Sequence, residues 1–475
     1  MRARKTILAF LALWICAVGS PAAAGSTLDV PSAQFTTIQS AIDAALPTDL
    51  IVVAPGTYLE VIDFSGKPIT LRSSGGSAVT TIDGTGISDS VVKCINGEGA
   101  DTVLEGFTIT GGIAEFGGGM QIINSSPTLV DCDFSANTAT ERGGGLYNFN
   151  SSPTVTNCTF SNNFASFMGG GMHNDTNSSP TITNCTFIQN RSDDDGGGMR
   201  NYIECHPTIT NCAFIENSCF EEGGGLGNRK NSNPTVINCV FLGNSAFSGG
   251  GMENHQGIVM GPGEPTIINC LFVGNIGIEG GGMRNNDPNP ILTNCTFTDN
   301  VGHGMNNKGG TPQITNCIFR NNTLGSFDGP SSPIVTYSDI EGGFVGAGNI
   351  DVDPLFVDPD GPDNDPLTLE DNDYRLLAGS DCIDVGLNTA MPAPQTTDLD
   401  GNPRIVNCTI DMGVYEFQAA GGSCNDSDGD GILDDGDNSG VAGDSPCTAG
   451  TTSDCDDNCP NTVNADQADA DSDGV

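Results

Sequence analysis

Short alternations of apolar and polar residues recur along most of the chain. In the stretch Pro180–Phe187, the apolar residues Ile182 and Phe187 are separated by threonines and other small polar residues. Such a short, β-branched pattern predicts strands and not helix. Cys185 and Phe187 keep the two-residue parity of one strand, but Ile182 and Cys185 are three residues apart. The parity break predicts a corner at Asn184, because Asn tolerates the left-handed backbone conformation.

This alternation belongs to a repeat that two sequence words mark. The first word is Asn-Cys-x-Phe-x-x-Asn or close to it, with its cysteine at Cys132, Cys158, Cys185, Cys212, Cys239, Cys270, Cys295 and Cys317. The second word is Gly-Gly-Gly-Met/Leu, which ends at Met120, Leu146, Met172, Met199, Leu226, Met252 and Met283, with a degenerate copy at Gly304-Met305. The cysteine spacings are 26, 27, 27, 27, 31, 25 and 22 residues. A period of this size indicates a solenoid.

Each copy predicts one coil of about three short strands, with further corners at Asn190 and at Gly196–Gly198. Stacked coils place each strand in parallel register with its copy, about 4.8 Å along the axis. Parallel crossovers are almost always right-handed. The predicted fold class is therefore all-β, a right-handed single-stranded parallel β-helix. A leucine-rich-repeat horseshoe would need leucine ladders and helical segments, and the repeat has neither.

An asparagine recurs two residues after each Met/Leu. Stacked asparagines can hydrogen-bond to one another along an axis, so we predict a polar ladder of Asn148, Asn174, Asn201, Asn228, Asn254, Asn285 and Asn307.

The N-terminal part of the solenoid is expected to carry a helical cap. Asp49–Tyr58 and Ile69–Arg72 are interpreted as the first coils, and Thr36 with Gln39 matches a capping box. A solenoid needs such a cap at its open end. Apolar residues at helical spacing precede the first coils: Ile38, Ala41, Ile42 and Ala45.

Residues 1–24 have the layout of a secretory signal peptide. Arg2, Arg4 and Lys5 precede the apolar run Ile7–Val18, and Ala22–Ala24 supply a cleavage position. The run is short for a transmembrane anchor, and no second apolar stretch of that kind follows. We expect a secreted or cell-surface protein.

The charge of the chain excludes some partners. It contains 59 Asp and Glu against 16 Lys and Arg, a formal net charge of −43. Such a surface repels nucleic acids and anionic lipids and attracts cations. The sequence does not indicate an oligomeric state.

At this point the sequence resembles the pectin lyase-like right-handed β-helix superfamily. The stretch Thr37–Ala45 leading to Ala54–Tyr58 looks like the usual start of that fold. The Phe-x-x-Asn and Gly-Gly-x-Met/Leu words resemble repeats of bacterial polymorphic outer-membrane proteins, which are adhesins, although those use Gly-Gly-Ala. Residues 25–349 are then the β-helix with its cap. Residues 350–418, with words such as Asp398–Gly401 and Asp411–Glu416, are similar to the closing segment of exported bacterial β-helix proteins.

The resemblance raises the possibility of an enzyme, because many members of the superfamily cleave acidic polysaccharides. Its hydrolases combine grouped aspartates with a Gly-His-Gly word, and Gly302-His303-Gly304 is such a word. This word occupies the slot of a glycine triplet, so we interpret it as a degenerate repeat. The accompanying Asp-Asp and Arg-x-Lys words are missing around it.

The superfamily's lyases use a carboxylate-bound calcium and an Arg or Lys base. Arg200 and Arg284 share the slot after Met, and Asp193–Asp195 lies nearby, so one groove could hold both ingredients. Charges on solvated loop tips are the alternative. We assign no catalytic residue and expect an adhesive, structural or glycan-binding protein, whose partner is an extracellular glycan or a surface or matrix protein. A polysaccharide lyase or hydrolase acting on acidic glycans is the alternative. Basic residues near the middle coils are few: Arg191, Arg200, Arg229, Lys230 and Arg284.

The cysteines divide into three groups. The eight ladder cysteines are expected to point inward as small buried hydrophobic residues. Cys205 and Cys219 lie outside the ladder in adjoining loops and are a candidate pair. Cys382 and Cys408 in the closing segment are the stronger candidate disulfide for an oxidising compartment.

The composition changes abruptly after residue 418, and residues 419–475 are expected to form a calcium-binding tail. Carboxylates at loop positions 1, 3, 5, 9 and 12, with Gly431 at position 6, suit calcium. The tail resembles thrombospondin type 3 repeats, and the pattern is cut off at Val475, which predicts a truncated array. A disordered acidic linker is the alternative. The predicted calcium ligands are Asp426, Asp428, Asp430, Asp434, Asp437, Asp469, Asp471 and Asp473.

Overall fold

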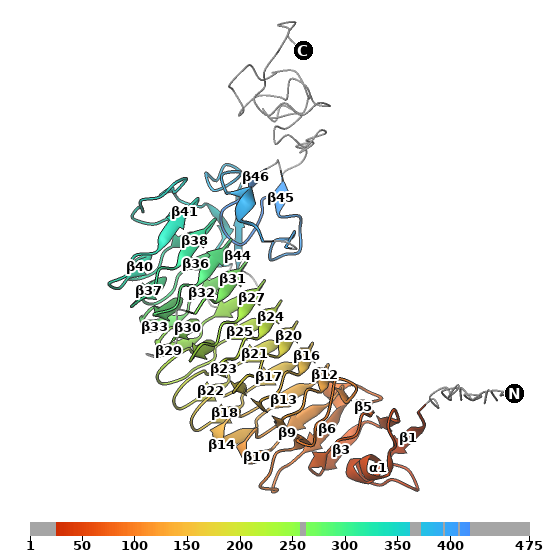
Figure 1. Ribbon diagram of the computed structural model, residues 1–475. Coiled ribbons are helices and arrows are strands. Elements are labelled where there is room, and N and C mark those ends of the chain that lie inside the picture. The colour runs from red at the N-terminus through yellow and green to blue at the C-terminus, as the bar shows by residue number, and fades with distance from the viewer. Residues whose placement is uncertain (1–24, 257–262, 362–371, 393–394, 407–408, 419–475) are drawn as a thin grey trace, which may run out of the picture.

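Parallel strands wind into a long rod in the computed structural model (Figure 1), which describes residues 25–256, 263–361, 372–392, 395–406 and 409–418. Within these residues, sheets of 13, 12 and 11 strands run along the rod. One coil contributes β20 (Thr181–Thr183), β21 (Thr186–Ile188) and β23 (Met199–Tyr202) to the three sheets in turn. The predicted all-β parallel solenoid is confirmed.

The 11-stranded sheet carries the candidate site on its outer face. From β11 to β37 its strands begin at the Met/Leu of the repeat, and neighbours pair in parallel, as Met172 pairs with Met199. Its strands in order are β4 (Ile62–Asp63), β7 (Val92–Cys94), β11 (Met120–Ile123), β15 (Leu146–Phe149), β19 (Met172–Asp175), β23, β26 (Leu226–Arg229), β30 (Met252–His255), β34 (Met283–Asn286), β37 (Met305–Asn307) and β40 (Phe327–Asp328).

The corners of the coil follow the sequence with one exception. Asn184 has φ +53° at the first corner and Gly196 has φ +67° at the third, as predicted. The second corner is Gln189, with φ +53°, so the prediction of Asn190 is wrong. Asn190 instead points inward, where its Nδ2 donates to the backbone oxygen of Phe160 at 2.8 Å and to Oδ1 of Asn217 at 2.9 Å.

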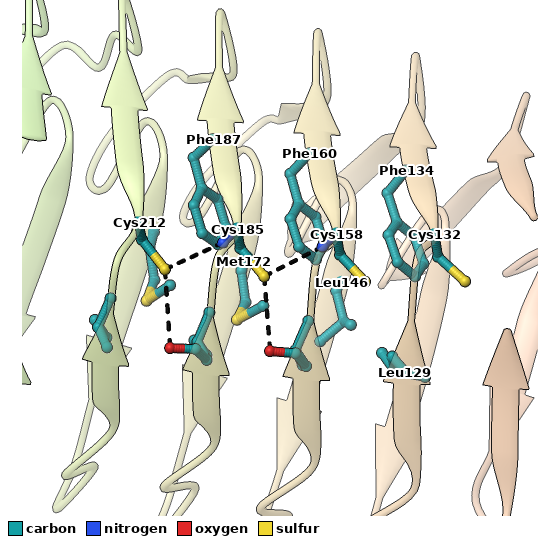
Figure 2. Packing of buried hydrophobic residues seen from close by; sticks show 14 of the residues in the cluster. Leu129, Cys132, Phe134, Leu146, Cys158, Phe160, Met172, Cys185, Phe187 and Cys212 are labelled. Carbon is teal, nitrogen blue, oxygen red and sulfur yellow. Dashed lines mark hydrogen bonds between the residues drawn. The ribbon is translucent and has the colours of Figure 1, made fainter. Parts of the chain in front are cut away.

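Buried ladders form the core. Successive phenylalanine rings lie parallel, with centroids 4.8 Å apart for Phe134 and Phe160 (Figure 2). The ladder cysteines lie beside them and are fully or almost fully buried. The backbone N–H of Cys158 donates to Sγ of Cys185 at 3.4 Å, and that thiol donates to the backbone oxygen of Thr183 at 3.3 Å. The ladder thiols are therefore inside, as predicted.

Polar ladders accompany the apolar ones. Asn174 Nδ2 donates to Asn201 Oδ1 at 2.7 Å, and the same bond recurs along the predicted asparagine ladder.

The glycine triplets allow coils to approach closely. A Cβ on Gly198 would lie 2.5 Å from the backbone oxygen of Gly225. Only glycine, which has no Cβ, avoids this steric clash.

The N-terminal helix α1 (Ile38–Ala44) is present, but its capping box is not the predicted one. Thr37 and Ser40 form the box, because Thr37 has the extended backbone that an N-cap requires. Thr36 and Gln39 do not. Gln39 uses its side chain to donate to Oδ1 of Asp43 at 2.8 Å. The buried face of α1 belongs to the same apolar cluster as the coils. An unpredicted strand, β1 (Thr27–Val30), precedes the helix and pairs with β2 (Leu50–Val53).

The described part of residues 350–418 packs along the outside of the 12-stranded sheet. Tyr374 and Val414 lie in one apolar cluster with Leu271 and Val273 of β32 (Leu271–Val273). A hydrogen bond adds to this contact, since the backbone N–H of Val414 donates to the side-chain Oγ1 of Thr296 at 3.1 Å. None of the helices in the described ranges has the length and apolar character of a membrane span.

Of the two cysteine pairs proposed outside the ladder, Cys205 and Cys219 do not form a disulfide. Cys205 and Cys219 are both free thiols in the structure. Cys205 is buried in a column of serines, where its N–H donates to Oγ of Ser232 at 3.2 Å. Cys219 lies at another corner, where its N–H donates to the backbone oxygen of Ser245 at 3.0 Å. Cys382 is a buried free thiol, and Cys408 lies outside the described residues.

Candidate functional site

Two columns of side chains build a polar layer on the outer face of the 11-stranded sheet. In each strand the Met/Leu and the asparagine two residues later face the core, so the residue between them faces outward. We call this the outer column, and its members include Tyr147, His173, Arg200, Gly227, Glu253 and Arg284. The residue before each glycine triplet forms the corner column, which includes Arg142, Asp195, Glu222 and Glu279. Several outer-column residues are buried although they face outward.

The layer begins with stacked rings. Tyr147 lies parallel to His173 with centroids 5.7 Å apart. His173 is fully buried, and Asp175 lies 3.8 Å from its Nε2 while also pairing with Arg142 at 2.7 Å. Burial lowers the pKa of His173 despite this carboxylate, so the ring is neutral at pH 7.

Arg200 lies at the centre of the layer. Its guanidinium forms an ion pair with Asp195 at 2.7 Å, and both side chains are buried. The guanidinium extends over Gly227, where a Cβ would lie 2.5 Å from Nη1. The sequence correctly placed Arg200 beside the Asp193–Asp195 run. Asp193 itself makes an exposed pair with Arg191 at 2.6 Å.

Beyond Gly227 the layer contains two carboxylates and a histidine. His255 Nδ1 lies 2.9 Å from Oε1 of Glu222, and Arg284 Nη1 lies 2.8 Å from Oε1 of Glu253. Burial opposes ionisation of Glu222, yet the hydrogen bond with His255 and the charge of Arg200 lower its pKa to about 2. Burial raises the pKa of Glu253 well above its ordinary value, even with Arg284 beside it.

These residues form three neighbouring groups of ion pairs, in which five basic side chains face five carboxylates. We call the three groups together the ion-pair network. The basic residues are Arg142, Arg200, Arg229, Arg284 and Lys308, and the acidic residues are Asp175, Asp195, Glu222, Glu253 and Glu279. The network thus uses five of the 16 Lys and Arg residues of a very acidic chain.

The network opens into a surface hollow of about 500 Å³, which we call the aromatic hollow. Phe220 and Phe247 rise on one side, with 76% and 51% of their surface exposed. Lys308 is half exposed and lies 3.5 Å from Glu279. The lining residues are Phe220, Glu221, Glu222, Phe247, Ser248, Glu279, Arg284 and Lys308. Apolar ring faces and charged groups therefore meet at one accessible place.

Most residues of this hollow were missed from the sequence, although the repeat contains a signal for them. Arg284 was identified, whereas Glu253 stands in the same slot after Met and was not. Glu222 and Glu279 both directly precede a glycine triplet, as Asp195 does. Aligning the repeats at the outer-column and corner-column positions would have found the charged residues. It would not have shown that the corner segments bury them.

The other predicted site residues lie elsewhere. His303 occupies the middle of a glycine-triplet slot, since its backbone oxygen accepts from the N–H of Gly281 at 2.8 Å and Met305 pairs with Met283. It is a degenerate repeat position, as interpreted. The predicted calcium ligands lie outside the described residues, and they are Asp426, Asp428, Asp430, Asp434, Asp437, Asp469, Asp471 and Asp473.

Three groups in the described residues bring possible metal ligands within 4.8 Å of one another. One is Glu222, Glu253 and His255, in the ion-pair network. A second is Asp194, Asp195 and Glu221, beside it. The third is Asp384, Asp411 and Glu416 in the segment after residue 350. In the third group both oxygens of Glu416 and both of Asp411 already accept backbone N–H bonds, which leaves little room for an ion.

Comparison with known proteins identifies the family. Residues 69–241 and 240–350 match the model of the right-handed beta helix region. The chain belongs to this family, which also confirms the predicted handedness.

The solved structures with similar folds are distant. A pectate lyase, Pel9A, is 15% identical with a TM-score of 0.44, covering 83% of this chain and 98% of the other. A pectin methylesterase from carrot is 12% identical with a TM-score of 0.31, covering 58% and 83%. The receptor binding domain of a siphovirus 9NA tailspike is 13% identical with a TM-score of 0.30, covering 69% and 76%. At these values the three structures say nothing about the activity of this chain. No curated protein matches it.

Proposed function

We propose that this protein is a secreted or cell-surface β-helix that binds extracellular glycans at the aromatic hollow. The observation that carries the proposal is the pairing of two exposed rings, Phe220 and Phe247, with the charged groups of Glu279, Arg284 and Lys308. Ring faces offer apolar area for the faces of sugars, and a few placed polar groups fix orientation. The layout of residues 1–24 supports export.

The tail and the cap complete the proposal. The carboxylates of residues 426–437 support calcium binding by the tail, with the adhesive role that such tails would serve at a cell surface or matrix. Helix α1 supports a capping role, because Ile38, Ala41 and Ile42 are buried with the first coils.

A glycan-array and calorimetry experiment on the full chain tests glycan binding, with and without calcium. Phe220→Ala and Phe247→Ala should each weaken binding about tenfold, which corresponds to about 1.4 kcal/mol. Leu324→Ala is the matched control, because Leu324 is equally exposed but does not line the hollow. Unchanged binding by both phenylalanine variants would place the glycan elsewhere and contradict the proposal.

A polysaccharide lyase or hydrolase for acidic glycans is the second candidate, and Lys308 is the observation in its favour. Its amine is half exposed among the carboxylates of the hollow, as an accessible base would be. Arg200 is a poor candidate because it is buried in an ion pair. We expect the protein to release neither unsaturated uronates nor new reducing ends from pectin or alginate. Turnover that Lys308→Ala, Arg200→Ala or His303→Ala abolishes would favour the enzyme.

A further inference from the structure

Glu222, Glu253 and His255 meet beneath the aromatic hollow from two parts of the chain. Glu253 and His255 lie on β30 with one residue between them, so both face the outer side of the sheet. Glu222 reaches them from the corner column of the preceding coil. One ligand atom from each residue lies within 4.8 Å of the others, and His255 Nδ1 is already 2.9 Å from Glu222 Oε1.

Two oxygens of this group are left over. Glu253 is completely buried, and its Oε2 has no hydrogen-bond partner in the described part of the chain. Oε2 of Glu222 is in the same state, because Arg200 and Arg229 both stay 3.6 Å away. A buried carboxylate oxygen without a partner is rare in native proteins and calls for a bound water or ion.

We propose that Glu222, Glu253 and His255 bind a divalent transition-metal ion of the zinc class. One imidazole nitrogen with two carboxylate oxygens is a donor set that zinc, cobalt and related ions accept, whereas calcium prefers oxygen ligands alone. Three protein ligands leave a coordination position for water or for a bound ligand. The site is separate from the predicted calcium loops of the tail and does not rest on glycan binding.

The surrounding charges orient the ligands. Arg284 holds Oε1 of Glu253 at 2.8 Å and Glu279 at 2.9 Å, which leaves Oε2 of Glu253 to bind the ion. Hydrogen bonds of this kind fix ligating carboxylates in metal sites.

The ion can reach the site from solvent. The side chains of His255 and Glu222 retain 18% and 14% exposure, and Glu222 also lines the aromatic hollow.

The test titrates the metal-stripped full chain with Zn²⁺ by calorimetry and with Co²⁺ by visible absorption. Because the acidic tail and its cysteines can also bind these ions, the proposed site is identified by comparing the wild type with variants of the three ligands. His255→Gln, Glu222→Gln and Glu253→Gln should each remove one tight site, with at least a tenfold loss of affinity there. His206→Gln is the matched control, because His206 is exposed on the loop after β23 and does not belong to the proposed ligand group.

Circular dichroism of each variant establishes that it is folded before titration, and His255→Gln is the least disruptive of the three. The loss of one Co²⁺ site in His255→Gln but not in His206→Gln would support the proposal. Equal stoichiometry and affinity in the wild type and His255→Gln would overturn it. The free oxygens of Glu222 and Glu253 would then bind water only.

Discussion

Arg200 shows how one glycine can decide the position of a buried charge. Its side chain turns along the sheet into the space above Gly227 and reaches Asp195 without meeting solvent. A side chain at position 227 would take that space. The position of the Arg200 side chain therefore depends on the absence of a Cβ at position 227.

We predict that Gly227→Ala destabilises the protein by about 1–3 kcal/mol, the usual cost of overpacking. The new Cβ would meet Nη1 of Arg200 at 2.5 Å, so the buried pair with Asp195 must shift. Denaturant unfolding measures the change. Gly99→Ala is the control, because a Cβ there meets no atom within 4 Å. Equal stability of the two variants would contradict this account.

Glu222 should give a pH-dependent contribution to stability. Its pKa falls from an ordinary value of 4.5 to about 2 in the folded protein, against the effect of burial, because of His255 and Arg200. A lowered carboxyl pKa contributes stability above the unfolded value, and this is lost as the pH falls from about 4.5 to 2. Unfolding free energies of wild type and Glu222→Gln should therefore converge over that range. Parallel curves would show that Glu222 titrates normally.

At the scale of the elements, the sequence was most informative where a residue type strongly favours one backbone conformation. Asn184 was correctly placed at a corner because its backbone conformation is one that Asn tolerates. The corner at Gln189 was missed, because Gln has no preference for the left-handed conformation. The neighbouring coils hold its backbone in that conformation. Thr37 was missed as N-cap for a similar reason, because Thr36 fits the capping pattern equally well. The fold could be predicted from periodicity, whereas the candidate site required knowing which corner segments cover which column.

The ladder cysteines form an element that should be chemically silent in the native state. They are fully or almost fully buried, so a reagent in solvent does not reach their thiols. Parallel stacking also aims neighbouring Cβ atoms the same way, which opposes disulfide geometry. We predict that a thiol reagent labels these eight residues only after denaturation. Ladder-to-ladder disulfides detected by mass spectrometry of native protein would contradict this.

At the scale of the whole molecule, the coils and the tail should respond differently to calcium. The coils are held by backbone bonds and buried ladders, which need no metal. The predicted loop of residues 426–437 carries closely spaced carboxylates that a cation would neutralise, so binding and ordering should be coupled there. EDTA should make residues beyond about 420 protease-sensitive while residues 30–418 stay intact.

Asp428→Ala combined with Asp430→Ala should reproduce the effect of EDTA at the first loop. Asp101→Ala combined with Glu115→Ala removes the same charge from exposed positions on the coils and is the control. Limited proteolysis and calcium calorimetry of the full chain provide the measurements. The calcium assignment is wrong if the two double variants bind calcium equally at millimolar concentrations.

The direction of the hydrogen bonds between coils has a mechanical consequence. Because every long sheet pairs one coil with the next, these bonds lie along the axis of the rod. A force that pulls the two ends apart would load the bonds of the outermost coil and spare the others, so the rod should unzip one coil at a time. Each event would release about 27 residues, the spacing of Cys185 and Cys212, or roughly 90 Å of extended chain. Single-molecule pulling should therefore give a series of small steps, whereas one large step would mean that the coils yield together.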